Sequence, residues 1–215
     1  MAVDKEDMPY FMSKDIVDQR DPNRQTPHRL INLHELAKVG VEFLERDQME
    51  LPNLAAVYSM KNRDAISISK ATPGYNELIK GFFKEHLHKD AELRFIKSGS
   101  GYFDVRSADD EWIRIPVCAG DFLFLPPGIY HRFTTDHNDM VEAIRFFQCS
   151  PRWTAYLRDD DGDKQPERNE FLLKNGLIKS DRHQRIMSDI ANPLVVRLNP
   201  NGTEYTCVYC NQLLD

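Results

Sequence analysis

A run of short apolar segments that starts near Phe82 constrains the fold of this chain more than any other feature. Glycine, proline and polar residues separate the segments, as turns separate the strands of a barrel or sandwich. A helical bundle would need longer segments with helical periodicity. The segments are Leu93–Ile96, Tyr102–Val105, Trp112–Val117, Phe122–Leu125, His131–Thr134 and Ala143–Phe147. We therefore predict a mainly β fold.

Three turns are predicted between these segments. Ser98–Gly101 contains two glycines, which permit the positive φ of a tight hairpin, so this segment is expected to join two strands. Gly120-Asp121 and Pro126–Gly128 mark two further turns.

Two helices are expected before these segments. Asn32 can cap a helix together with Glu35, and apolar residues then recur at helical spacing, which predicts a helix over residues 33–46. Asp64–Ser69 alternates in the manner of a strand. A Thr-Pro pair at 72–73 predicts a short second helix, because proline is favoured at the first helical position.

The length of 215 residues fits one domain, because β-barrels of this size commonly share a single core. We expect a metalloenzyme domain over residues 1–176 that begins with the helical segment, and a C-terminal extension over residues 177–215. The extension reads as a β-hairpin packed on or near the barrel, since an Asn-Pro-Asn-Gly turn separates Leu194–Leu198 from Thr203–Tyr209. The charged stretch Arg158–Glu170 lacks calcium-loop spacing and is expected to be a solvated loop.

A formal net charge of −6, with no Lys/Arg cluster, argues against nucleic acid as a partner and leaves a small molecule. No apolar run is long enough to span a bilayer, and the first residues are acidic where a secretory leader would be basic. We expect a cytoplasmic location, with the nucleus as a second compartment. A closed barrel permits a monomer.

Four scattered cysteines do not form the framework of a small secreted domain, so most are expected to be reduced thiols. Cys207 and Cys210 form a single CxxC pair. On one strand they would lie on opposite faces, which argues against a bond between them.

Potential metal ligands concentrate between Glu85 and Glu92. On a strand, His86 and His88 would project from one face, and Glu92 has the same parity. His131 begins a later apolar segment soon after a turn, and it is the best candidate for a fourth ligand. Imidazoles with a carboxylate suit iron, nickel, manganese, cobalt or zinc, and would leave positions open for a chelating substrate or O₂.

These ligands lie within a pattern that resembles the two motifs of the cupin superfamily. Its residues here are Gly81, His86, His88, Glu92 and Gly99, followed by Gly120, Pro126, Gly128 and His131. The spacing from glycine to first histidine is one residue shorter than usual, and Thr135 stands where the second motif often has Asn. The resemblance implies a double-stranded β-helix, or jelly-roll barrel, with a few peripheral helices.

Longer strings narrow the resemblance to the acireductone dioxygenase family of the methionine salvage pathway. They are EHLHKDAELRF, GSGYFDVR, WIRI, PPGIYHRF and WTAY. The family implies an enzyme that cleaves the acireductone 1,2-dihydroxy-3-keto-5-methylthiopentene with O₂. With Fe²⁺ the implied products are formate and 4-methylthio-2-oxobutanoate; with Ni²⁺ they are formate, carbon monoxide and 3-methylthiopropanoate. One such ion per chain is expected.

The resemblance also implies roles for individual residues. The matching positions are His86, His88, Glu92 and His131 for the metal, Arg94 and Arg145 for the basic part of the pocket, and Phe82, Phe133 and Trp153 for its aromatic part. An enediol would bind the metal as an anion, and Arg94 could stabilise the negative charge that develops as O₂ is reduced. The aromatic residues would surround the methylthioethyl tail and keep water out. We hypothesise that charge neutralisation carries more of the catalysis than a protein general base.

Structural roles for these residues, and other functions for the fold, remain open at this point. The two arginines could form structural ion pairs, and the three aromatic residues could belong to the core. A different cupin enzyme, such as an isomerase or a thiol dioxygenase, would share the barrel. A metal-binding cupin could also act as a non-enzymatic partner module. Metal binding without O₂ uptake on addition of acireductone would select the module.

Overall fold

The computed structural model describes residues 8–44, 56–150 and 154–177, together with three short strands nearer the C-terminus. Contacts divide the chain into two units, Met1–Asn175 and Gly176–Asp215. None of the helices in these described ranges is both long and apolar enough to cross a membrane.

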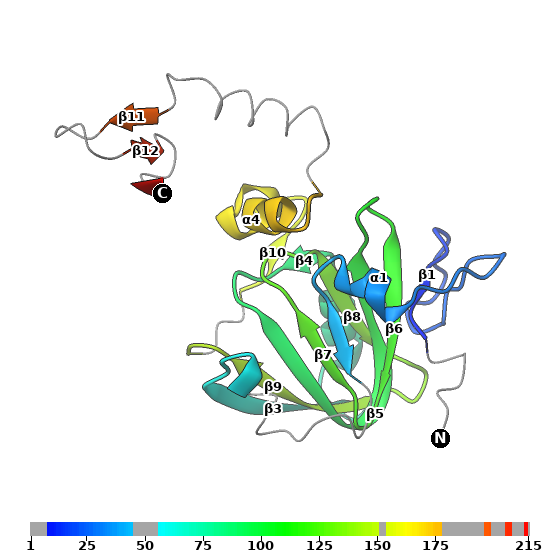
Figure 1. Cartoon of the computed structure of the whole chain (residues 1–215). Helices are drawn as coiled ribbons and strands as arrows, with labels where there is room; N and C mark the ends of the chain where they lie inside the picture. The colour runs from blue at the N-terminus through cyan, green and yellow to red at the C-terminus, as the bar shows by residue number, and fades with distance from the viewer. Residues whose placement is uncertain are drawn as a thin grey trace. The chain divides into compact units, whose positions relative to one another are not determined.

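Strands are the main regular secondary structure of the first unit (Figure 1). They are β1 (Tyr10–Phe11), β2 (Glu42–Leu44), β3 (Asn62–Ser69), β4 (His86–Leu87), β5 (Glu92–Arg106), β6 (Trp112–Cys118), β7 (Phe122–Leu125), β8 (His131–Thr135), β9 (Met140–Phe147) and β10 (Tyr156–Leu157). The helices are α1 (Leu33–Ala37), α3 (Tyr75–Phe82) and α4 (Pro166–Lys174), with a 3₁₀ turn at Gly162–Lys164. The prediction of a mainly β fold with a few peripheral helices is confirmed.

Strand β5 organises the sheet because it pairs with four other strands. Its first half pairs with β7 and β9, and its second half pairs with β6 and β8. The register with β9 shifts between Ile96 and Ser98, and Gly99 follows with a φ of 76°. A bulge of this kind bends a strand, so β5 contributes to two differently paired halves of the sheet.

The predicted hairpin at Ser98–Gly101 is therefore wrong. Two segments that we expected to be separate strands are one strand of 15 residues. Gly99 serves the bulge instead of a turn, because a Cβ there would clash with the main-chain oxygen of Met140 on β9. The turns at Gly120-Asp121 and Pro126–Gly128 lie between strands as predicted.

The predicted helix over 33–46 is also too long. The capping box of Asn32 and Glu35 is present, but α1 ends at Ala37. Gly40 adopts a φ of 73°, a conformation that ends a helix. Residues 42–44 then pair with β7 as strand β2, so Phe43 is buried by sheet pairing and not by a helix face.

Two smaller predictions need correction. The strand predicted at 64–69 is β3, but the helix that follows begins at Tyr75, because Gly74 in the left-handed conformation occupies the N-cap position. The charged stretch 158–170 is not simply a solvated loop. It contains the 3₁₀ turn and the start of α4, in which Arg168 and Phe171 are buried.

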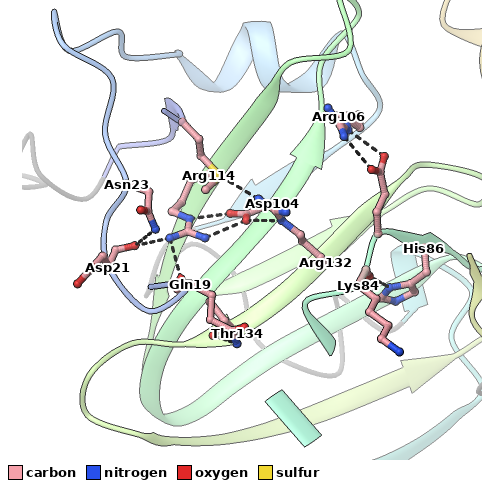
Figure 2. A network of polar contacts seen from close by, with 12 residues as sticks. Gln19, Asp21, Asn23, Lys84, His86, Asp104, Arg106, Arg114, Arg132 and Thr134 are labelled. Atoms are coloured by element: carbon pink, nitrogen blue, oxygen red, sulfur yellow. Dashed lines mark hydrogen bonds and ion pairs between the residues drawn. The ribbon is translucent and has the colours of Figure 1, made fainter. Parts of the chain in front are cut away.

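A buried ion cluster joins β5, β6 and β8 (Figure 2). Asp104 lies opposite Arg114 of β6 and Arg132 of β8 in the sheet register. Its carboxylate accepts from Arg114 Nε at 2.7 Å, from Arg114 Nη2 at 2.9 Å and from Arg132 Nε at 2.8 Å. Arg114 also donates to the main-chain oxygens of Gln19 and Asp21. The cluster therefore ties the N-terminal segment to the sheet.

The second unit contains β11 (Val196–Leu198), β12 (Tyr205–Cys207) and β13 (Leu213–Leu214). β11 and β12 pair antiparallel, and β13 pairs with β12. The packing of this extension on the barrel stays a prediction, and the side chains of Cys207 and Cys210 lie outside the described residues. The side chains of Cys118 and Cys149 are exposed.

Candidate metal centre

Three histidines from two chain segments meet at one point. His86 of β4 lies opposite His131 of β8 in the sheet register, and His88 follows directly after β4. The ring centroids are 4.5 Å apart for His86 and His131, 5.0 Å for His86 and His88, and 5.3 Å for His88 and His131. One ring nitrogen from each histidine lies within 4.8 Å of the others. Such spacing permits all three to bind one ion.

Main-chain carbonyls fix the orientation of each imidazole. Nδ1 of His86 lies 2.7 Å from the oxygen of Lys84, Nδ1 of His88 lies 2.8 Å from that of Thr154, and Nδ1 of His131 lies 3.1 Å from that of Ile129. A carbonyl can only accept, so each Nδ1 carries the proton and each Nε2 keeps a free lone pair. Burial lowers the pKa of His86 to about 3 and also lowers that of His88, so both rings are neutral.

Glu92 completes the set from the first position of β5. It does not share a strand with the first two histidines, as parity had suggested, because β4 ends at Leu87. Its Oε2 lies 3.2 Å from Nε2 of His131 and 3.6 Å from Nε2 of His88. Neither nitrogen carries a proton in this tautomer, and Oε2 is buried without a hydrogen-bond partner.

A divalent cation fits this donor set. A buried carboxylate oxygen without a donor is costly, and it faces lone pairs that would otherwise repel it. A cation among Oε2 and the three Nε2 atoms would satisfy all four. Three imidazoles and a carboxylate are ligands of iron, nickel and similar transition metals.

Arg94 holds the other oxygen of Glu92. Nη2 of Arg94 makes a short ion pair with Oε1, and the Arg94 side chain is only 11% exposed. Burial alone would raise the pKa of Glu92, but the neighbouring guanidinium lowers it well below its ordinary value. The carboxylate is therefore ionised and ready to bind a cation.

A cavity of about 210 Å³ adjoins these ligands. Phe82 at the end of α3 and Phe133 on β8 line it, as do both predicted arginines. Trp153 lies outside the described residues. Most of the remaining lining is aliphatic or aromatic and was not identified from the sequence: Ile66, Ile68, Ile96, Phe103, Val141, Ala143, Ala155 and Leu157.

Arg94 and Arg145 lie opposite each other on β5 and β9. Adjacent like charges on a sheet are unfavourable unless each has a counter-ion. Asp64 of β3 supplies one, since it accepts from Arg145 Nε at 2.9 Å and from Nη2 at 2.7 Å. The two adjacent arginines thus lie between two carboxylates, with Asp64 paired to Arg145 and Glu92 paired to Arg94. Arg145 takes part in a structural ion pair and also lines the cavity.

The acidic partner Asp64 was missed by sequence reasoning. It begins the alternating segment that predicted β3, and only the pairing of β3 with β9 reveals its neighbour. A further histidine, His137, is outside this set and pairs with Asp21 at 2.7 Å.

Comparisons of sequence and of structure with known proteins point to the same family. The model of the ARD/ARD' family matches residues 8–155. The chain is 44% identical over 170 residues to the acireductone dioxygenase of Gallus gallus, which is 76% of this chain and 93% of that protein. It is 44% identical over 158 residues to the acireductone dioxygenase of Aspergillus fumigatus, covering 72% of this chain and 89% of that protein.

A solved structure supports the fold. An acireductone dioxygenase from Bacillus anthracis with a cadmium ion in its active centre matches 69% of this chain and 96% of that chain, with a TM-score of 0.56 and 23% identity. The predicted cupin fold is thereby confirmed. Together with the family match over residues 8–155, the relatives show that this chain belongs to the ARD/ARD' family.

Proposed function

We propose that this chain is an acireductone dioxygenase that cleaves 1,2-dihydroxy-3-keto-5-methylthiopentene with O₂. One observation supports this most strongly: a buried Glu92 oxygen without a donor faces free nitrogens of His88 and His131 beside an apolar cavity. The names of the relatives, which the chain matches over about nine-tenths of their length, support the same substrate.

His86, His88, His131 and Glu92 would hold one divalent ion, Fe²⁺ or Ni²⁺. When bound, such an ion would supply a Lewis acid and a template for the two enediol oxygens of the substrate. The carbonyl-fixed tautomers keep the three Nε2 atoms available without prior loss of a proton.

The cavity residues would bind and shield the rest of the substrate. Phe82, Phe133 and the aliphatic side chains of β3 and β9 offer an apolar surface for a methylthioethyl tail. Arg94 and Arg145 place two positive charges at the same cavity. An anionic enediol would be stabilised there, and Arg94 would also stabilise charge that develops during oxidation. Trp153 remains a predicted pocket residue.

The proposed products depend on the ion. Fe²⁺ would give formate and 4-methylthio-2-oxobutanoate, a methionine precursor, which places the activity in methionine salvage. Ni²⁺ would give formate, carbon monoxide and 3-methylthiopropanoate. The test is to load metal-free protein with each ion, add acireductone and O₂, and measure oxygen uptake and carbon monoxide. The proposal would be refuted if the protein took up no oxygen with either ion. A monomer in the cytoplasm and nucleus stays a prediction.

The role of Arg94 can be tested with Arg94→Met. Loss of this guanidinium should lower kcat by about a hundredfold to a thousandfold, as removal of one charge-stabilising donor does in other enzymes. Metal content must be measured in parallel, because Arg94 also pairs with Glu92. Arg63→Met is the matched control, since Arg63 is an exposed arginine on β3. Turnover near wild type in metal-loaded Arg94→Met would contradict the charge-neutralisation hypothesis.

A further inference from the structure

Arg158 lies directly after β10 and contacts the chain neighbours of two candidate ligands. Its Nη1 donates to Glu85 Oε1 at 2.7 Å, and its main-chain N–H donates to the Glu85 main-chain oxygen at 3.3 Å. Its guanidinium carbon also lies 5.0 Å from the centre of the Tyr130 ring. Glu85 precedes His86, and Tyr130 precedes His131.

The two contacted residues occupy equivalent places beside their histidines. Glu85 lies between Lys84, whose carbonyl accepts from Nδ1 of His86, and His86 itself. Tyr130 lies between Ile129, whose carbonyl faces Nδ1 of His131, and His131 itself. In each case Arg158 contacts the residue that joins the orienting carbonyl to the ligand.

The third histidine depends on the same segment. Nδ1 of His88 lies 2.8 Å from the carbonyl oxygen of Thr154, which lies just before β10 in the segment that leads to Arg158. That segment is held to the site by β10, whose Leu157 lies opposite His86 in the register with β4. Movement of this segment would therefore shift the acceptor that orients His88.

Other groups hold Arg158 in this position. Asp110, in the turn between β5 and β6, accepts from Nη1 and Nη2 of Arg158 at 2.8 Å each. Arg106, at the end of β5, donates to Glu85 from Nε at 2.9 Å and from Nη2 at 2.7 Å (Figure 2). The negative charges of two carboxylates thus balance the positive charges of two guanidiniums. Since the cluster is neutral overall, its effect on the site is chiefly geometric.

We propose that Arg158 is a positioning residue for the metal centre, which holds the two histidine-bearing segments and the Thr154 carbonyl in one arrangement without touching metal or substrate. Its partners Glu85, Asp110 and Tyr130 do not line the cavity, within the described part of the chain. Groups that orient metal-binding histidines commonly contribute about tenfold to a hundredfold in metal affinity. This inference rests on the proposed metal centre.

The experiment compares metal affinity in full-length Arg158→Gln, Arg158→Lys and Glu85→Gln with wild type. Ni²⁺ and Co²⁺ dissociation constants are measured by competition with a chromophoric chelator, and the visible spectrum of bound Co²⁺ reports ligand geometry. Arg29→Gln is the matched control, because Arg29 also pairs with a carboxylate, Glu111 at 2.6 Å, and lies over an aromatic ring, that of Phe11.

Arg158→Gln should weaken metal binding by about tenfold to a hundredfold and change the Co²⁺ spectrum. Arg158→Lys should recover part of the affinity, and Arg29→Gln should match wild type. Urea unfolding of the metal-free proteins separates positioning from stability. If Arg158→Gln does not fold, Glu85→Gln takes its place, since it removes the same ion pair together with that between Glu85 and Arg106.

An unchanged dissociation constant and Co²⁺ spectrum in the folded variants would overturn the inference, even if their unfolding free energy fell. His131→Ala, measured in the same series, tests the site itself. Retention of wild-type metal affinity in His131→Ala would refute the proposed metal centre. If His131→Ala loses metal affinity while Arg158→Gln and Glu85→Gln keep it, only the role of Arg158 is refuted.

Discussion

Asp104→Asn should destabilise the protein strongly, because Asp104 is the common acceptor of a buried ion cluster. Its side chain is 1% exposed, and those of Arg114 and Arg132 are 0% and 10% exposed. The substitution keeps the shape of the side chain but removes the negative charge and one acceptor oxygen. Three charge-assisted hydrogen bonds at 2.7–2.9 Å would lose their carboxylate.

The expected loss is about 3–5 kcal/mol, the usual cost of removing one member of a buried ion pair. A protein with a typical unfolding free energy of about 5–15 kcal/mol would lose a large share of its stability. For a chain of this size, the melting temperature should fall by about 10 °C. The two arginines would remain buried next to each other, which is the main reason for the size of the effect.

Urea unfolding followed by far-UV circular dichroism measures this loss. Asp18→Asn is the matched control, because Asp18 also accepts from an arginine, Arg20, through Nε at 3.2 Å and Nη2 at 2.8 Å. The Asp18 side chain is 32% exposed, so its replacement should cost only about 0–1 kcal/mol. An Asp104→Asn variant no less stable than Asp18→Asn would refute the reasoning that burial sets the cost.

Two further predictions concern the backbone and the pH dependence. Gly99→Ala should cost several times more stability in urea unfolding than Gly74→Ala: both have positive φ, but only at Gly99 would the new Cβ meet a main-chain oxygen, whereas Gly74 has open space around it. Similar losses would contradict the strand-bulge interpretation. The hydrogen bond from Tyr75 lowers the pKa of Asp139. Ionised Asp139 therefore stabilises the folded protein above the unfolded-state pKa of about 3.9, and this stabilisation is lost as the pH falls through the lower folded-state pKa. The unfolding free energy of Asp139→Asn should fall less than that of wild type between about pH 5 and pH 3, and parallel profiles would contradict this.

Local patterns in the sequence were sufficient to predict the class of the fold. The short apolar segments lie in strands, and turn residues end most of them. The pattern could not show that Leu93–Ile96 and Tyr102–Val105 form one strand, since a bulge and a hairpin both favour glycine at positive φ. The predicted helix over 33–46 was too long for a related reason. Gly40 is left-handed and residues 42–44 pair with β7 as β2, so the helical spacing of apolar residues does not reflect a helix there.

The candidate ligands could be predicted because they are close in sequence or start a strand. Their surroundings could not, since they come from pairing between distant segments. Asp64 reaches Arg145 only through the register of β3 with β9. Arg158 belongs to a charged stretch that looked like a solvated loop, and only the pairing of β10 with β4 brings it to Glu85.

The central claim is that His86, His88, His131 and Glu92 form one divalent-metal centre. Equilibrium dialysis of metal-free protein against Ni²⁺, with bound metal measured by mass spectrometry, tests it most directly. We predict one tightly bound ion per chain in wild type and in His137→Ala, whose histidine is outside this set and pairs with Asp21. His131→Ala should lose that ion. Equal metal content in His131→Ala and wild type would contradict the claim.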